Sequence, residues 1–146
     1  MALARSITLL AAIAFFGLGL LGGTWKYAKI RRSPTGEAPT YVDVFHRSCL
    51  LYAFACLLLE RMVEASGLAD GVELAAVTAL LGFFGFAVFG YAVHGWLDDT
   101  DNQLRRPHRL GERTLPPALV HASMIALVGA ELGGFAVLAY GVIAAL

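Results

Sequence analysis

Three histidines carry the clearest chemical potential in this sequence, because each lies near the end of a long apolar stretch. His46 precedes one such stretch, His94 ends the next, and His121 lies near the start of the last. The nitrogens of neutral imidazole bind haem iron and transition metals. If the stretches are helices of one bundle, we expect the three side chains to lie at a similar depth. Each could instead be an interfacial imidazole bonded to a backbone carbonyl or a lipid headgroup.

Phenols, a thiol and a carboxyl group add to this candidate chemistry. Tyr52 and Tyr91 are expected at similar depths, where they could donate hydrogen bonds to a ligand or serve as interface aromatics. Cys49 lies in a stripe of small residues beside His46, which could leave space for a flat macrocycle or reflect ordinary helix packing. Glu131 falls near the middle of an apolar stretch. A carboxyl group there is either functional or bonded to another helix.

The composition shows which elements must position these side chains. Of 146 residues, 58% are hydrophobic and 15% are charged, whereas a soluble domain has about a quarter charged residues. The charges are confined to short segments between apolar stretches long enough to span a bilayer. We therefore predict one all-α domain, a bundle of four transmembrane helices in the lipid bilayer. The predicted helices cover residues 4–28, 43–66, 72–97 and 116–145.

The first predicted helix is interpreted as a retained anchor rather than a signal peptide. Its apolar run is too long for a signal peptide, and it ends at Trp25 without a small-residue cleavage site. Gly19 and Gly23 in this helix, and Gly129 and Gly133 in the last, are spaced to let another helix approach closely. Glycines are also simply frequent in membrane helices.

The basic residues predict the orientation of the bundle. Nine of the eleven lie in or beside the segments 29–42 and 98–114, and the other two are Arg5 and Arg61. The positive-inside rule then places both segments in the cytoplasm and both termini outside, in what we expect to be a bacterial inner membrane. The net charge is zero, so charge gives no reason to expect a nucleic-acid partner. His108, within the second basic segment, is expected to be solvated.

Several features in order along the chain carry a family resemblance. Gly19 and Gly23 end the first helix, and the turn 33–36 reads Ser-Pro-Thr-Gly. His46 opens the second helix, Tyr91 lies late in the third, and the pair 102–103, Asn-Gln, lies in the loop before the fourth. In these features the chain resembles the styrene oxide isomerase family and its hydroxylaminobenzene mutase relatives, which are small four-span membrane proteins.

The resemblance implies a cofactor, a reaction and an assembly. It implies that His46 is the axial ligand of haem b, held between the subunits of a homotrimer, and that the ferric iron acts as a Lewis acid. The implied reaction opens a small lipophilic epoxide to a carbonyl compound, with Tyr91 orienting the substrate. The family has an asparagine six residues after the histidine, and this chain has Tyr52 there.

Two other functions agree with the same residues. In a membrane cytochrome for electron transfer, two of His46, His94 and His121 would coordinate one haem iron. In a non-catalytic subunit of a larger membrane complex, the glycine-rich helix faces would pack against a partner. A haem-b protein of the isomerase type is the leading interpretation, with Cys49, His94 and His121 as further candidates around the cofactor.

Overall fold

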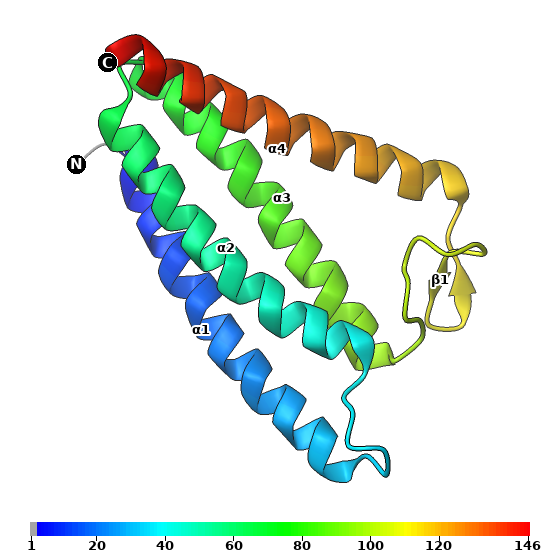
Figure 1. Ribbon diagram of the computed structural model, residues 1–146. Helices are drawn as coiled ribbons and strands as arrows, with labels where there is room; N and C mark the ends of the chain where they lie inside the picture. The colour runs from blue at the N-terminus through cyan, green and yellow to red at the C-terminus, as the bar shows by residue number, and fades with distance from the viewer. Residues whose placement is uncertain (1–2) are drawn as a thin grey trace.

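The computed structural model describes residues 3–146, and over that range it contains four long helices and one short hairpin (Figure 1). All four helices are long and apolar enough to cross a membrane, so the predicted all-α bundle is confirmed. The elements in chain order are α1 Leu3–Arg32, α2 Thr40–Ala65, α3 Asp70–Leu97, β1 Arg109–Leu110, β2 Arg113–Thr114 and α4 Pro117–Ala145.

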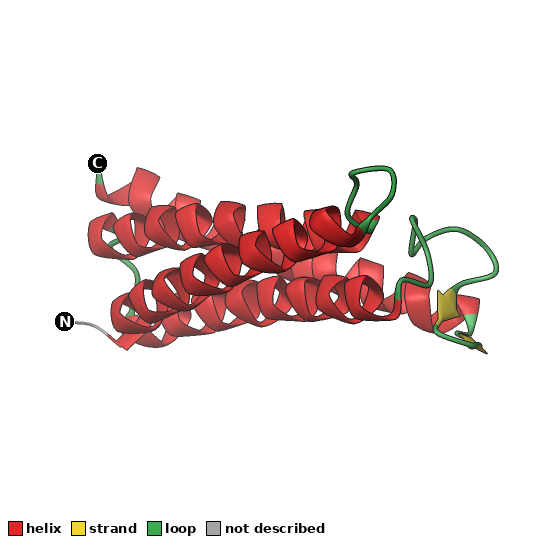
Figure 2. Ribbon diagram, turned by 90° about the horizontal axis from the view of Figure 1, so that it is seen from below, coloured by secondary structure: helices red, strands yellow, loops and turns green. Residues whose placement is uncertain are grey.

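The helices run up and down, so that the connections lie alternately at the two ends of the bundle. The chain termini and the α2–α3 turn share one end, and the α1–α2 loop and the hairpin share the other (Figures 1 and 2). Helices α1 and α2 lie side by side along their length, whereas α4 meets α3 near the C-terminus and diverges toward the hairpin (Figure 1). The segments 29–42 and 98–114 therefore lie at the same end, as the alternation of spans requires.

Two helix boundaries differ from the expected ones by three residues or more. Helix α1 continues to Arg32 rather than ending at 28. Helix α2 begins at Thr40 rather than at residue 43, directly after Pro39, so Asp43 lies inside the helix. Proline has no N–H to leave unpaired and its fixed φ suits a helix start. The Asp43 carboxylate instead binds Lys26 of α1, which ties the two helices together next to the loop.

Small residues allow α1 and α2 to pack closely. A Cβ atom added at Gly19 would lie 2.9 Å from Leu50 Cγ, and one at Gly22 would lie 3.1 Å from His46 Cα. The expected close approach at Gly19 therefore holds. In α4, by contrast, no side chain or neighbouring backbone lies within 4 Å of the corresponding positions at Gly129 and Gly133. That pair is not used for packing among the described residues.

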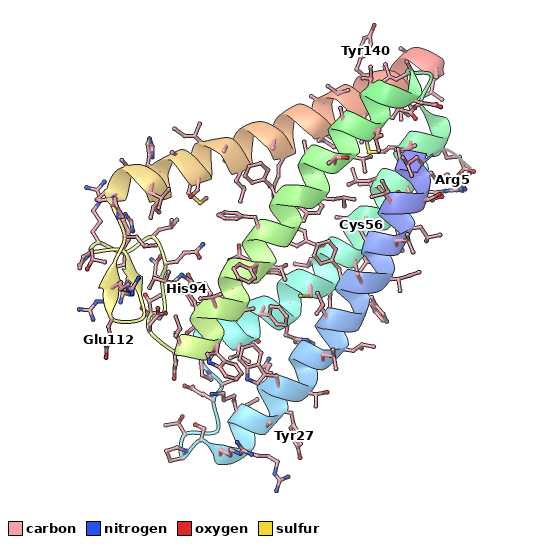
Figure 3. All side chains as sticks on the ribbon, turned by 180° about the vertical axis from the view of Figure 1, so that it is seen from behind. Arg5, Tyr27, Cys56, His94, Glu112 and Tyr140 are labelled. Carbon is pink, nitrogen blue, oxygen red and sulfur yellow. The ribbon has the colours of Figure 1, made fainter. Side chains whose placement is uncertain are left out.

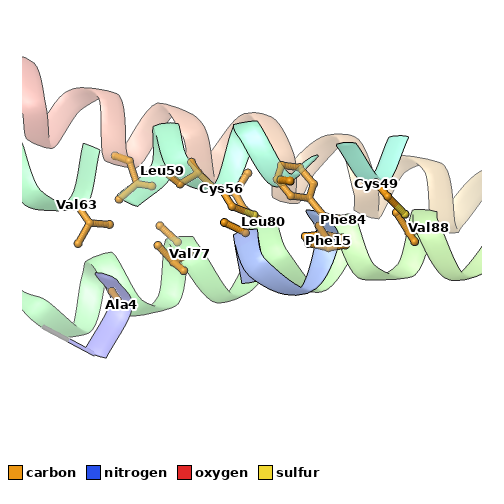
Figure 4. Close-up of a cluster of buried hydrophobic side chains, with 14 of the residues drawn as sticks. Ala4, Phe15, Cys49, Cys56, Leu59, Val63, Val77, Leu80, Phe84 and Val88 are labelled. Carbon is orange, nitrogen blue, oxygen red and sulfur yellow. The ribbon is translucent and has the colours of Figure 1, made fainter. Parts of the chain in front are cut away.

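The apolar core lies between α1, α2 and α3, with one contribution from α4 (Figure 4). Cys49 and Cys56 are fully buried in it as free thiols, packed among aliphatic and aromatic side chains. At the end of the bundle that holds the termini, Arg5 forms ion pairs with Glu60 and Glu64 (Figure 3 labels Arg5). These pairs fix the start of α1 to the last turns of α2.

Candidate functional site

His46 lies on α2 at its seam with α1, half-buried against the glycines of that helix. Its Nδ1 lies 2.7 Å from the carbonyl oxygen of Gly19. Because a carbonyl only accepts, Nδ1 carries the proton and donates it, which leaves the Nε2 lone pair available. A Cβ atom at Gly23 would lie 3.0 Å from the ring carbon Cε1 of His46, so the glycine makes room for the imidazole. This hydrogen bond is the kind that orients a metal-binding histidine.

Charged side chains lie beside His46 toward the loop end. Asp43, one helical turn earlier on α2, binds Lys26 Nζ at 2.5 Å and Arg47 Nη2 at 2.6 Å. Apart from this contact with Asp43, the Arg47 side chain faces outward and is 65% exposed. Two cations therefore lie within about a turn of the imidazole, and a single carboxylate binds both.

An apolar groove follows the same seam in the other direction. Residues four, eight and eleven positions after His46 share its face of α2, because the helix repeats every 3.6 residues. Leu50 lies next, and Phe54 and Leu57 then line a groove of about 550 Å³ between α1 and α2. The other lining residues are equally apolar or small: Leu9, Ala12, Ile13, Phe16, Gly17 and Ala53. His46 thus stands between a charged region and an apolar one.

The two candidate phenols line a different cavity, the α3–α4 crevice. This crevice of about 380 Å³ lies between α3, α4 and the hairpin segment, where α4 diverges from α3. Tyr52 of α2 reaches it with its ring stacked on Phe84 at a centroid distance of 4.2 Å. Tyr91 lines it from α3, and its ring stacks against Tyr41 at 5.9 Å. His46 does not line the crevice. Within one chain, the predicted site residues therefore lie on two different faces of the bundle, His46 toward α1 and the phenols toward α4.

His94 also lines the α3–α4 crevice, near the end of α3 (Figure 3), and its imidazole is hydrogen-bonded to Asp99. Its Nδ1 lies 2.8 Å from Asp99 Oδ1, and both side chains are less than a tenth exposed. Asp98 adopts a left-handed conformation with φ 50°, and its N–H donates to the His94 carbonyl oxygen at 2.8 Å. Aspartate tolerates this conformation, and the turn brings the next residue back toward the helix.

The Asp99 carboxylate accepts a second hydrogen bond, from the hairpin. The N–H of Gly111, a turn residue with φ 61°, lies 2.5 Å from Asp99 Oδ2. Burial alone would raise the pKa of the Asp99 carboxyl, but the bonds from Gly111 and His94 outweigh it and hold the pKa below its usual value. Asp99 therefore joins the end of α3 to the hairpin and orients the imidazole toward the crevice. The sequence offered one signal for this pair, an acidic residue five positions after a histidine at a helix end.

The remaining predicted site residues lie elsewhere. Cys49 belongs to the hydrophobic core, which is the packing alternative for its stripe of small residues. His121 is exposed on α4. His46, His94 and His121 thus have three different surroundings, and within residues 3–146 no group of three His, Cys, Asp or Glu side chains could hold a metal ion. A haem needs only one or two such ligands.

The expectation that His108 is solvated is wrong. His108 is only 7% exposed, and its Nδ1 lies 3.3 Å from the Gln103 carbonyl oxygen. The loop folds back on itself here, and the N–H of Leu115 donates to the His108 carbonyl oxygen at 2.8 Å. The N–H of Gln103 in turn donates to the phenol oxygen of Tyr41 at 2.7 Å, which joins this loop to α2. The basic composition of the segment 98–114 gave no indication of these contacts.

Glu131 of α4 lies one turn beyond Leu127, which lines the α3–α4 crevice. Its Oε1 is buried and has no hydrogen-bond partner within residues 3–146. Glu131 itself is not among the residues that line the crevice.

Comparisons with known proteins find no match to this chain. No protein-family model matches it, and neither does any curated protein or solved structure. The chain's own residues form a seam at His46, with charged side chains on one side and an apolar groove on the other, and a separate, mostly apolar crevice lined by Tyr52, Tyr91 and His94.

Proposed function

We propose that this protein is an integral-membrane haem-b protein in which His46 is the axial ligand. The observation that carries the proposal is the 2.7 Å hydrogen bond from His46 Nδ1 to the Gly19 carbonyl oxygen. It fixes the tautomer, so Nε2 keeps the lone pair that iron requires. Bonded histidines are common, and the surroundings of this one are what favour haem over a purely structural role.

The seam around His46 suits the two chemical parts of haem b. The macrocycle is apolar and flat, and the groove between α1 and α2, which Phe54 and Leu57 line about two and three helical turns beyond His46, offers it an apolar wall. The two propionates are anionic, and Lys26 and Arg47 lie on the opposite side of His46 from the groove. Both cations are bound by a single carboxylate, Asp43, so they retain capacity for further anionic partners.

When bound, haem would supply a ferric iron that acts as a Lewis acid on the oxygen of a small lipophilic epoxide. The chain's own contribution is the α3–α4 crevice, where the phenols of Tyr91 and Tyr52 can bind and orient such a molecule. Apolar side chains such as Phe86, Phe89 and Leu127 hold its hydrocarbon part and exclude water from the oxygen. This assignment follows the resemblance to the styrene oxide isomerase family.

Because His46 and the phenols lie on different faces of one chain, we propose that a complete site takes two copies. The seam of one subunit would meet the crevice of the next, as in a closed ring such as a trimer. We also propose that this end of the bundle faces the cytoplasm, because nine of the eleven basic residues lie there.

Subunit mixing tests the shared site. His46→Ala and Tyr91→Phe variants are each expected to lose conversion of an aryl epoxide to the aldehyde. Co-expression of the two variants should restore part of the activity, because some interfaces then combine an intact His46 with an intact Tyr91. No recovery, in mixed oligomers shown to form by two affinity tags, would place the whole site within one chain and contradict the proposal. Wild-type protein loaded with haem but inactive on aryl epoxides would reject the reaction.

A non-catalytic subunit of a larger membrane complex is the second candidate. It is favoured by the open face of α4, where a Cβ atom added at Gly129 or Gly133 would have nothing within 4 Å in the described chain. Glycines at this spacing let another helix pack closely. Purification from the native membrane with a stoichiometric partner and no cofactor absorbance would support this candidate over the haem protein.

A further inference from the structure

A separate pocket lies at the loop end of the bundle, between the last turns of α1 and α3. It has a volume of about 350 Å³ and is lined by Trp25, Ala28, Lys29, Arg32 and Trp96. The other three α1 residues lie three, four and seven positions after Trp25, so all four share one face of that helix. Trp96 adds a wall from α3. The pocket thus combines two basic side chains with two indole rings, and no acidic side chain lines it.

The two basic side chains of this pocket have no acidic partner. Lys26, three positions before Lys29, binds the Asp43 carboxylate. Within residues 3–146, by contrast, Lys29 and Arg32 form no ion pair. Two cations that share a pocket repel each other unless an anion lies between them. An anionic ligand is therefore the partner that this pocket lacks.

The pocket lies at the depth of lipid headgroups. Trp25 ends the uncharged stretch of α1, and Trp96 lies two residues before Asp98, the first charge after the apolar stretch of α3. Tryptophan concentrates at this level of a membrane, where its ring meets hydrocarbon and its N–H meets polar headgroups. A ring contact with Phe45 of α2 holds Trp25, whereas Trp96 is 80% exposed. A phospholipid can therefore reach the pocket from the bilayer.

We infer that this pocket binds the headgroup of an anionic phospholipid with one net negative charge, of the phosphatidylglycerol type. Lys29 and Arg32 bind its phosphate, and the two indole rings pack against its glycerol and the start of its acyl chains. A zwitterionic headgroup fits less well, because its quaternary ammonium group would lie near the same two cations. The site is separate from His46 and from the α3–α4 crevice, so the inference holds whether or not the protein binds haem.

The two tryptophans provide the test. The chain has no other tryptophan, so its fluorescence reports on this pocket alone. Wild-type protein is reconstituted in phosphatidylcholine vesicles that contain an increasing fraction of either phosphatidylglycerol or phosphatidylcholine brominated near the headgroup end of its acyl chains. Bromine quenches an indole ring that it contacts. Dividing by the emission in unbrominated vesicles of the same headgroup composition removes every other contribution.

A site for an anionic headgroup predicts different quenching by the two brominated lipids. We expect half-maximal quenching at a fraction of phosphatidylglycerol about fivefold to thirtyfold lower than that of phosphatidylcholine. Each basic side chain close to an anionic lipid contributes about fivefold, and the pocket has two.

Two charge-matched double variants identify the residues responsible. Lys29→Gln combined with Arg32→Gln should bring the two lipids to within about twofold. Arg31→Gln combined with Arg113→Gln removes the same charge at the same end of the bundle, from exposed side chains outside the pocket, and should retain the preference. This control separates a built site from the general attraction of anionic lipids to a basic surface.

The possible results separate clearly. Equal quenching of wild-type protein by the two lipids, a preference that survives without Lys29 and Arg32, or an equal loss in both double variants would each overturn the inference. If the Lys29 and Arg32 double variant does not fold, Arg32→Gln alone, at an exposed position, should still reduce the preference about fivefold, and no reduction would overturn the inference. Soluble glycerol phosphate should not relieve the quenching by phosphatidylglycerol; relief would assign the pocket to a soluble anion and reject the lipid.

Discussion

The close approach of α3 to the start of α2 gives a prediction that can be worked from the structure. A Cβ atom at Gly95 of α3 would lie 3.0 Å from the backbone nitrogen of Val42 and 3.1 Å from the carbonyl carbon of Tyr41. It would also lie 3.0 Å from the Trp25 ring. Backbone atoms of α2 cannot move aside without shifting that helix. Gly95→Ala should therefore force α3 away from the start of α2.

The size of the effect follows from two opposing terms. Overpacking a well-packed site costs about 1–3 kcal/mol, whereas replacing glycine by alanine within a helix gains up to about 1 kcal/mol. Gly90 lies in the same helix, and nothing lies within 4 Å of a Cβ atom added there. Gly90→Ala should therefore show only the gain in stability from the higher helix propensity of alanine. We expect Gly95→Ala to be less stable than Gly90→Ala by about 1–3 kcal/mol.

Unfolding in mixed micelles with increasing SDS, followed by circular dichroism, measures both variants under the same conditions. The comparison cancels the propensity term, because the substitution and the helix are the same. If Gly95→Ala is as stable as Gly90→Ala, the close contact between α3 and the start of α2 is refuted. The ring contact between Tyr41 of α2 and His94 of α3, with centroids 5.1 Å apart, would be refuted with it.

Two further predictions concern the ends of the bundle. The pKa of Asp99 is lowered in the folded state, so its bonds stabilise the fold fully above the unfolded value of 3.8, and that contribution is lost as the pH falls through the lower folded value. The melting temperature of wild-type protein should therefore fall more steeply below about pH 4 than that of Asp99→Asn, and parallel curves would refute the role of Asp99. Arg5→Met should lower the melting temperature more than Arg5→Lys does, because it leaves Glu60 without its cation and removes one of the two cations that bind Glu64; equal values would show that these ion pairs contribute nothing.

The helices could be predicted from the sequence because their signal is local. Charged residues are absent from long stretches, and no tertiary information is needed to see that such stretches span a bilayer. Boundaries were less certain because capping competes with tertiary contacts. Asp43 has the chemistry of a helix cap, but Pro39 starts the helix and Lys26 provides a stronger partner for the carboxylate.

The site could be predicted only in part, because sequence spacing does not say which neighbour a helix face meets. His46, Tyr52 and Tyr91 were recognisable as chemical groups, but nothing in their spacing showed that His46 faces α1 and the phenols face α4. The Asp99 bond to His94 and the burial of His108 depend on how the loop folds back. Composition predicts a charged loop to be solvated and carries no information about that path.

Haem binding by His46 is tested most directly by the optical spectrum of the purified protein. Wild-type protein supplemented with haem should show a Soret band that His46→Ala lacks. His121→Ala, which removes an exposed histidine from α4, should keep the band unchanged. A wild-type protein without a Soret band, or a band of equal intensity in His46→Ala, would contradict the account.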